Sequence, residues 1–132
     1  MFVWDDDLLT GDQVIDEQHK GIFKKLDSVL EMSADCSQPQ EIIKAFEFLV
    51  HYVYDHFNCE EELMKRHHYN EYELHKQHHT RFVNKIGQLA MVLKNNGTTP
   101  EFITQLKVVF IELFVQHIDE MDKRFARYLK TV

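Results

Sequence analysis

The sequence predicts an all-α protein, an up-down-up-down antiparallel four-helix bundle with an N-terminal arm, and three observations support this fold. Apolar residues recur at three- and four-residue spacing through four long stretches of the chain. Only four glycines and two prolines occur in 132 residues, which favours long helices joined by short turns. The sequence has no internal repeat, so a helical-repeat array is disfavoured and a bundle is the simplest packing.

Residues 1–14 show no helical period, and we expect them to form an ordered arm in which Phe2, Val3 and Trp4 pack against the body. A disordered tail is the alternative, and the aromatic content argues against it. The first helix is expected over residues 15–35. Its apolar stripe consists of Ile15, Ile22, Phe23, Leu26, Val29 and Leu30.

Two further helices are expected on either side of a turn at residues 69–70. Pro39 is well placed as the first residue of a helix over 39–67. The next helix is expected over 71–95, where Asn95, Asn96 and Gly97 provide a strong stop signal. The apolar residues of the earlier helix are Ile42, Phe46, Leu49, Val50, Val53, Phe57 and Met64. Those expected on the core face of the later helix are Leu74, Phe82, Ile86, Leu89 and Leu93.

The fourth helix is expected over residues 100–130, with Thr99 as its cap and Pro100 at its first position. Its apolar positions include Phe102, Leu106, Val109, Phe110, Phe114, Met121 and Phe125. No linker separates the four helices. We therefore expect two parts, an arm at 1–14 and a single bundle domain at 15–132.

Composition excludes several classes of partner. The formal net charge is −7 and the basic residues are scattered, which argues against nucleic acid or an anionic membrane as partner. The sequence has no run of 18 apolar residues, and its acidic start is unlike a signal peptide, so we expect a cytoplasmic protein. Cys36 and Cys59 do not form a CxxC motif and are interpreted as small packed thiols.

The nine histidines are a surplus for so short a chain, and imidazole is the commonest metal ligand among side chains. His56 and Glu60 lie four residues apart, as do His75 and His79. A four-residue step in an α-helix returns to within roughly 40° of its starting direction. Each pair can therefore direct two ligand atoms from one helical face toward a single place.

The other two helices also carry ligand-type residues. His19 falls on the apolar stripe of the first helix, and His117 and Asp122 lie five residues apart on the fourth. A five-residue step separates side chains by roughly 140° on an ideal α-helix, so we expect Asp122 to reach sideways to a second metal. Five imidazoles and two carboxylates exceed the four ligands of one zinc ion and suit two bridged metals. These ligand types alone do not select iron.

The remaining histidines are expected at helix ends or solvent-facing positions. They are His51, His67, His68 and His78. Glu61 points about 100° away from its neighbour Glu60 and is interpreted as a surface charge or as a group that contacts a ligand.

Four motifs resemble those of the hemerythrin family, and within it the bacterial branch, the bacteriohemerythrins. They are IDEQHK at residues 15–20, HFNCEE at 56–61, HKQHHTRF at 75–82 and HIDEMD at 117–122. The spacings H-x3-E, H-x3-H and H-x4-D follow one another in that order. The similarity extends over the chain from about Trp4 onward.

This resemblance implies a non-haem di-iron centre that binds O₂. The implied metal ligands are His19, His56, Glu60, His75, His79, His117 and Asp122. The three histidines of the third and fourth helices would hold a coordinatively full iron, and the other two would hold an iron with one open position. The two carboxylates would bridge the irons together with an oxo or hydroxo group, and O₂ would bind as hydroperoxide on the five-coordinate iron.

The chain departs from the family pattern at two places. Asn70 stands where many relatives have proline, and Leu113 and Phe114 stand where a Trp-Leu pair is common. Phe114 and Ile118 are expected near the open position and so form the expected O₂ pocket. An apolar lining of this kind excludes water and protons that help peroxide escape.

The expected function is therefore reversible O₂ binding for carriage, storage or scavenging, without enzymatic activity. No acid, base or nucleophile beyond the ligands is evident in the motifs. Two alternatives stay open: an O₂- or redox-sensing domain of a larger signalling protein, and a di-iron enzyme that handles peroxide or nitric oxide. The ends of the chain at Met1 and Val132 favour a free-standing carrier. We expect a monomer, and the sequence leaves an oligomer open.

Overall fold

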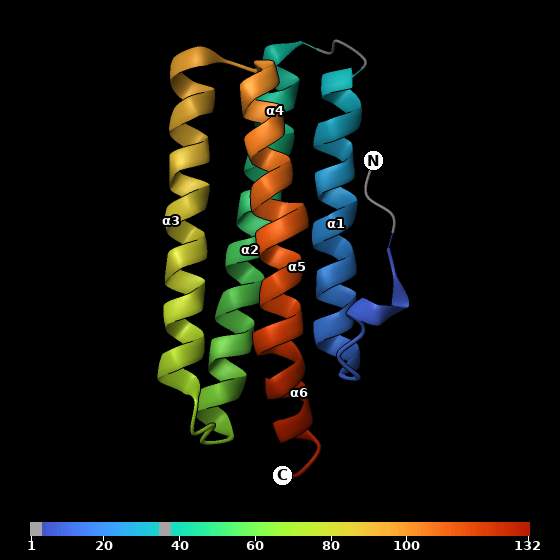
Figure 1. Ribbon diagram of the computed structural model, residues 1–132, viewed down its shortest axis with the longest axis vertical. Coiled ribbons are helices and arrows are strands. Elements are labelled where there is room, and N and C mark those ends of the chain that lie inside the picture. Colours follow the sequence, from blue (N-terminus) through green and yellow to red (C-terminus); the bar gives the residue numbers. More distant parts are fainter. Residues whose placement is uncertain (1–3, 35–37) are drawn as a thin grey trace.

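Four helical rods stand side by side and alternate in direction (Figure 1). The computed structural model describes residues 4–34 and 38–132, and these contain helices and no strand. The first three rods are α1 (Gln13–Ala34), α2 (Pro39–Arg66) and α3 (Tyr72–Asn96). The fourth rod is built from α4 (Pro100–Lys107), η2 (Val108–Leu113), α5 (Phe114–His117), η3 (Ile118–Asp122) and α6 (Lys123–Leu129). The expected four-helix bundle is confirmed.

The segment before α1 contains the short 3₁₀ helix η1 (Asp6–Leu8), and hydrogen bonds to one buried carboxylate hold its end in place. Asp16 accepts hydrogen bonds from the Thr10 backbone N–H at 2.8 Å, the Thr10 hydroxyl at 2.7 Å and the Gly11 N–H at 3.2 Å. Asp12 caps α1, because its side chain accepts a hydrogen bond from the backbone N–H of Ile15 at 3.0 Å. The helix therefore begins two residues before the expected start.

Trp4 packs against α1 as expected, with its ring centroid 6.0 Å from that of Phe23 and the ammonium group of Lys20 over its face. Phe2 and Val3 lie outside the described residues. The division of the chain into an arm at 1–14 and a bundle at 15–132 stays a prediction.

Local signals set the ends of the other helices much as the sequence predicts. Pro39 is the first residue of α2. Gly97 ends α3 with a φ of 77°, and its N–H donates to the Leu93 carbonyl at 2.9 Å. Thr99 caps α4, because its hydroxyl accepts from the Phe102 N–H at 3.2 Å.

The fourth rod differs from the regular α-helix that the sequence predicts, because η2 and η3 are π-helical. The backbone N–H of Phe114 donates to the carbonyl of Val109, and the N–H of Lys123 donates to that of Ile118. Both bonds span five residues rather than four, and single π turns of this kind are frequent at functional sites. The second of these turns lies between His117 and Asp122.

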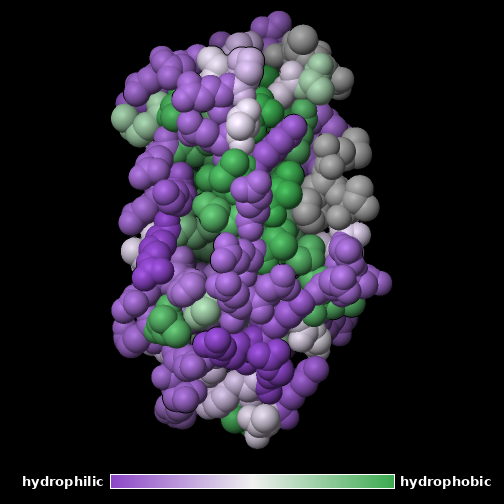
Figure 2. All heavy atoms as spheres, viewed as in Figure 1, coloured by the Kyte–Doolittle hydropathy of each residue, from purple (hydrophilic) through white to green (hydrophobic). Residues whose placement is uncertain are grey.

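Apolar packing fills the bundle on both sides of a buried polar layer. The larger cluster contains many phenylalanine rings, including Phe46 and Phe102 with centroids 5.5 Å apart. A smaller cluster beyond the polar layer consists of Ile15, Met64, Tyr69 and Phe125. Hydrophobic residues are visible in a central strip of the face in Figure 2, between mainly hydrophilic residues.

One expected core residue is misplaced. Leu74 is 41% exposed, so the prediction that it lies on the core face of the third helix is wrong. Successive residues of an α-helix point about 100° apart, and the neighbouring His75 occupies the inward direction. Among the described helices, none is both long enough and apolar enough to span a membrane.

The cap at Thr99 provides a test of the fold. We expect Thr99→Ala to lower the free energy of unfolding of the metal-free protein by about 1 kcal/mol, because the N–H of Phe102 loses its partner. Thr104→Ala is the matched control on the exposed face of the same helix and should change it by less than about 0.5 kcal/mol. Urea denaturation followed by circular dichroism measures both values, and equal effects would contradict the assignment of the cap.

Candidate metal centre

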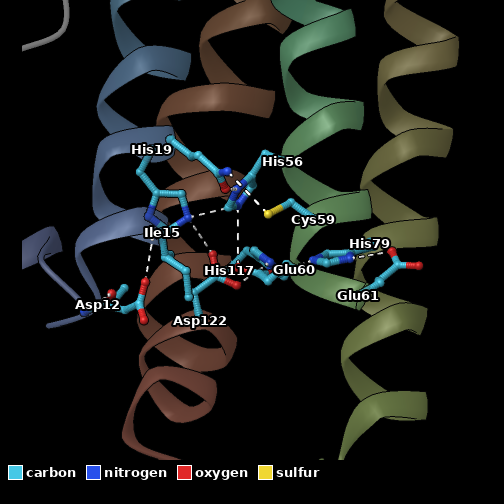
Figure 3. Close-up of polar contacts among 12 residues, drawn as sticks. Asp12, Ile15, His19, His56, Cys59, Glu60, Glu61, His79, His117 and Asp122 are labelled. Carbon is cyan, nitrogen blue, oxygen red and sulfur yellow. Dashed lines mark hydrogen bonds and ion pairs between the residues drawn. The ribbon is translucent and has the colours of Figure 1, made fainter. Parts of the chain in front are cut away.

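Seven buried ligand-type side chains, contributed by all four rods, converge on one place in the bundle. In Figure 3, side chains point toward one another from the blue, green, yellow and red-brown rods, among them the labelled His19, Glu60 and His117. The seven residues are His19, His56, Glu60, His75, His79, His117 and Asp122. Each of these residues is at most 6% exposed. The structure thus brings together every residue that the sequence suggested as a ligand.

The donor atoms form two groups that share both carboxylates. The three-histidine group consists of His75, His79, His117, Glu60 and Asp122. The two-histidine group consists of His19, His56, Glu60 and Asp122. Within each group the donor atoms lie within 4.8 Å of one another. The arrangement therefore offers two adjacent sites, one with five donors and one with four.

Each carboxylate directs one oxygen to each group. In the three-histidine group, His75 Nε2 lies 2.9 Å from Glu60 Oε1 and 3.0 Å from Asp122 Oδ1. His79 Nε2 lies 3.0 Å from the same oxygen of Glu60, and His117 Nε2 lies 3.0 Å from the same oxygen of Asp122. This part of the site therefore uses Oε1 and Oδ1 alone.

The second oxygen of each carboxylate faces the two-histidine group. His19 Nε2 lies 2.9 Å from Asp122 Oδ2, and His56 Nε2 lies 3.5 Å from Glu60 Oε2. The Nε2 atoms of His19 and His56 lie 3.2 Å apart. A carboxylate that directs one oxygen to each of two neighbouring donor groups is arranged as a bridge.

Several of these close atoms lack hydrogen bonds, and this is the test of whether a metal fits. Within the described part of the chain, both oxygens of Asp122, Glu60 Oε2, and the Nε2 atoms of His75 and His117 have no hydrogen-bond partner. Buried polar atoms without a partner cost free energy. Lone pairs that converge on a cation satisfy this requirement, and imidazole with carboxylate suits iron and zinc among other metals. The residues present therefore fit a metal centre.

The π turn η3 accounts for the placement of the fourth rod's two donors. Asp122 lies on the same side as His117, since a turn closed by a five-residue hydrogen bond returns the chain to nearly the same face after five residues. Its Oδ2 still extends to the second donor group, as expected. The expectation of two different faces assumed an ideal α-helix. The sequence offers no local pattern that marks the π turn.

Hydrogen bonds from the outer ring nitrogens fix the orientation of two imidazoles. His79 Nδ1 lies 2.8 Å from Glu61 Oε2, and His56 Nδ1 lies 2.6 Å from the amide oxygen of Gln18. Each acceptor holds the ring proton on Nδ1, which leaves Nε2 free to bind a metal. Glu61 thus contacts a ligand, one of its two expected roles. Sequence reasoning missed Gln18, because its partner is on another helix.

Burial and neighbouring charges shift the pKa values of these groups. Burial and Asp122 raise the pKa of Glu60, but the charge of His56 and the close contacts with His75 and His79 outweigh them and lower it to about 2. Burial lowers the pKa of His75, yet the close, charged carboxylates of Asp122 and Glu60 raise it to about 9. Burial lowers the pKa of His56 to about 4. At neutral pH the metal-free centre therefore holds ionised carboxylates and a protonated His75.

The other expected residues lie at the edge of the centre or away from it. His51 and His68 are exposed, and His67 and His78 are half-buried. Within the described ranges, these four histidines belong to neither donor group. Cys59 is a free, half-buried thiol, and Cys36 lies outside the described residues.

The two residues of the expected O₂ pocket are fully buried. The ring of Phe114 meets that of His19 edge-on, with centroids 5.7 Å apart, and stacks on His117 at 6.1 Å. Ile118 directly follows His117 and belongs to the same apolar cluster as Phe114. Phe114 therefore contacts a histidine of each group.

The raised pKa of His75 predicts opposite pH trends for stability and metal affinity. In the metal-free protein the contribution of His75 is present below its unfolded pKa of 6.5 and is lost as the pH rises through about 9. The free energy of unfolding should therefore fall over this range, measured by urea denaturation with a chelator present. Metal affinity should rise over the same range, because the proton competes with the metal. If the free energy of unfolding of a metal-free His75→Gln variant falls just as steeply with pH, this assignment is contradicted.

Comparison with known proteins is consistent with this geometry. A sequence profile described as the hemerythrin HHE cation binding domain matches residues 10–129. Bacteriohemerythrin of Pseudomonas paraeruginosa is 38% identical over 89 residues, which cover 65% of this chain and only 56% of that protein's length. Bacteriohemerythrin of Stenotrophomonas maltophilia is 27% identical over 130 residues, or 98% of this chain and 82% of that protein.

A relative named as a myohemerythrin also matches the chain. Myohemerythrin of Theromyzon tessulatum is 34% identical over 96 residues, which cover 72% of this chain and 74% of that protein. No solved structure matches the chain. The profile covers most of the chain, including all four rods and all seven converging side chains. The chain belongs to the hemerythrin family.

Proposed function

We propose that the two donor groups hold two non-haem iron ions and that the protein binds O₂ reversibly. The observation that carries this proposal is the division of the seven side chains into five donors and four, with both carboxylates shared. One solvent-derived oxo or hydroxo bridge would complete six ligands at the first iron and five at the second. The second iron would then keep one open position. The resemblance to hemerythrins supports iron as the proposed metal, whereas the donor types alone also suit other metals.

The seven side chains would hold a pair of ferrous ions, and such a pair would supply reversible two-electron chemistry toward O₂. The protein controls this chemistry through the number of negative charges among its ligands. With metal bound, the centre would offer five neutral imidazoles and only two carboxylates. A di-iron site with more carboxylates would stabilise the higher oxidation states of iron more strongly. The small number of carboxylates here therefore favours return of the electrons from O₂ over further oxidation reactions.

Apolar packing supports reversible binding over loss of peroxide. Phe114 is fully buried and lies against His19 of the two-histidine group, where the open position is proposed. Phe23 packs on Phe114 with centroids 5.7 Å apart, and Ile118 adds apolar surface in the same cluster. This lining excludes water, and with it the protons that would release peroxide.

A carrier, store or scavenger is the proposed role, rather than an enzyme. Among the described residues, the groups near the ligating histidines include phenyl rings, one amide, one carboxylate hydrogen-bonded to a ring nitrogen, and the imidazole of His78, whose centroid lies 6.0 Å from that of His117. An enzyme would need a general acid or a nucleophile directed at the bound O₂, and the proposed lining of that position is the apolar pair Phe114 and Ile118. A cytoplasmic location, a monomeric state and the lack of nucleic-acid or membrane partners stay predictions.

Loss of one proposed ligand provides the main test. We expect the protein loaded anaerobically with Fe²⁺ to contain two irons per chain and to show a visible charge-transfer band that appears in air and vanishes under nitrogen. His19→Ala should retain one iron and lose the reversible band, because the two-histidine group keeps a single imidazole. Iron is measured colorimetrically, and the spectrum is followed through repeated gas cycles.

His51→Ala is the matched control, because His51 is exposed on α2 one to two turns before His56. This variant should keep two irons and the reversible band. A wild-type protein with one iron per chain would contradict the proposal. A single permanent conversion to the diferric form in air would instead favour a sensing domain or an enzyme.

The apolar lining provides a second test. We expect Phe114→Leu to raise the rate of spontaneous oxidation in air by about tenfold or more, since a smaller side chain beside His19 admits water. Phe110→Leu is the control, because Phe110 is equally buried one turn earlier, with its ring 6.4 Å from that of Phe114. Decay of the charge-transfer band measures both rates. Equal rates would show that packing in general, rather than this lining, protects the centre.

A further inference from the structure

We propose that Gln18 is a positioning residue for the metal of the two-histidine group, and that its neutral amide makes that metal easier to keep reduced than its neighbour. This inference rests on the proposed two-iron site. It arises from a difference between the two groups that the ligands themselves do not explain. His56 donates its outer proton to an amide, whereas His79 donates its outer proton to a carboxylate.

The hydrogen bond to Gln18 fixes the chemical form of His56. An amide oxygen only accepts, so Nδ1 of His56 must carry the proton at a separation of 2.6 Å. Nε2 is then unprotonated and faces Glu60 and His19. Without this acceptor the ring could place its proton on Nε2, the atom that must bind the metal.

A second contact determines which end of the Gln18 amide faces His56. The amide nitrogen of Gln18 lies 3.5 Å from the sulfur of Cys59, which is three residues after His56 on α2. The nitrogen donates to the thiol, and the oxygen is therefore directed to the imidazole. Figure 3 shows His56 and Cys59 extending from the same green helix on one side of the centre. Cys59 thus has a structural reason to stand beside Glu60.

Gln18 also lies at the boundary between this histidine and solvent. A cavity of about 160 Å³ is lined by Gln18, Tyr52, Asp55 and His56. Gln18 is half-buried, and Asp55 is exposed on the outer side. An acidic residue at position 18 would therefore place a second negative charge in the cavity of Asp55. The amide supplies an acceptor without that charge.

The two acceptors affect their metals differently. A carboxylate attracts the Nδ1 proton more strongly than an amide, and this makes the imidazole a stronger donor through Nε2. The Glu61 contact of 2.8 Å therefore favours the ferric state at the three-histidine group. The weaker donor His56 favours the ferrous state at the two-histidine group, to which the site must return when O₂ leaves.

Metal affinity tests the positioning role without reference to O₂. Gln18→Leu keeps the size of the side chain and removes the acceptor. We expect it to weaken Co²⁺ binding at the two-histidine group by roughly 10–100-fold, measured by anaerobic titration against a competing chelator. The unfolding free energy of the metal-free protein should stay close to wild type, which separates positioning from packing. If Gln18→Leu also lowers the unfolding free energy, Gln18→Glu provides a second test. It retains an acceptor for His56 and should bind Co²⁺ as tightly as the wild type.

A double-mutant cycle assigns the effect to one group. In the His19→Ala background, which is expected to load only the three-histidine group, Gln18→Leu should cause no further loss of Co²⁺ affinity. Glu61→Leu should weaken binding in this same background, because its partner His79 belongs to that group. Equal losses for Gln18→Leu in both backgrounds would overturn the assignment.

The redox part is tested by exchanging the acceptor. We expect Gln18→Glu to speed conversion of the iron-loaded protein to the diferric form in air by about tenfold, and Glu61→Gln to slow it. Asp55→Asn changes the charge of the same cavity without touching the acceptor of His56. If Asp55→Asn slows oxidation by as large a factor, charge alone explains the effect and the inference fails.

The outcome for the wild-type protein separates this inference from the proposed function. A wild-type protein that binds one metal, or whose band does not disappear under nitrogen, removes the proposed function and the inference with it. A wild-type protein that binds two metals and cycles with O₂, while its Gln18 variants match it in Co²⁺ affinity and oxidation rate, removes the inference alone.

Discussion

The pairing of two buried carboxylates with five imidazoles is the interaction on which the rest of the structure depends. Glu60 is 1% exposed and Asp122 is 0% exposed, and an ionised carboxylate in such a place is costly unless it is paired. Their partners come from every rod, at N–O separations of 2.9 to 3.5 Å. Each rod must therefore take one rotation about its own axis, and the centre sets the mutual register of the bundle.

Apolar packing makes this arrangement possible in the metal-free protein. The large cluster on one side and the smaller cluster around Met64 and Phe125 on the other exclude water from the polar layer between them. The aromatic rings also contact the donors directly, since Phe57 stacks on His79 with centroids 3.9 Å apart. Fold and centre are thus stabilised by the same residues, and a ligand substitution affects both.

Sequence reasoning predicted most of the fold because its signals are local. The four-residue pairs His56–Glu60 and His75–His79 need only one helix each. The end of α3 at Gly97 depends on the positive φ that glycine adopts freely, and the start of α4 depends on the hydroxyl of Thr99. The prediction for Leu74 was wrong because neighbouring residues of a helix point about 100° apart, and the buried position is taken by His75. Gln18 and the π turns were missed because a partner on another helix and a five-residue hydrogen bond leave no local pattern. The ligand roles came from family resemblance.

The π turn at η3 also bears on how chains of this kind can differ in length. It accommodates one more residue than a regular turn, yet Phe125 and Ala126 beyond it remain fully buried, so the faces of the rod stay aligned on both sides. Removal of one residue from this stretch can leave those faces in place. The same deletion between His56 and Glu60, where α2 is regular, would rotate everything beyond it by about 100°. A change of one residue in chain length can therefore be accommodated inside a continuous helical rod, at η3, rather than in a loop.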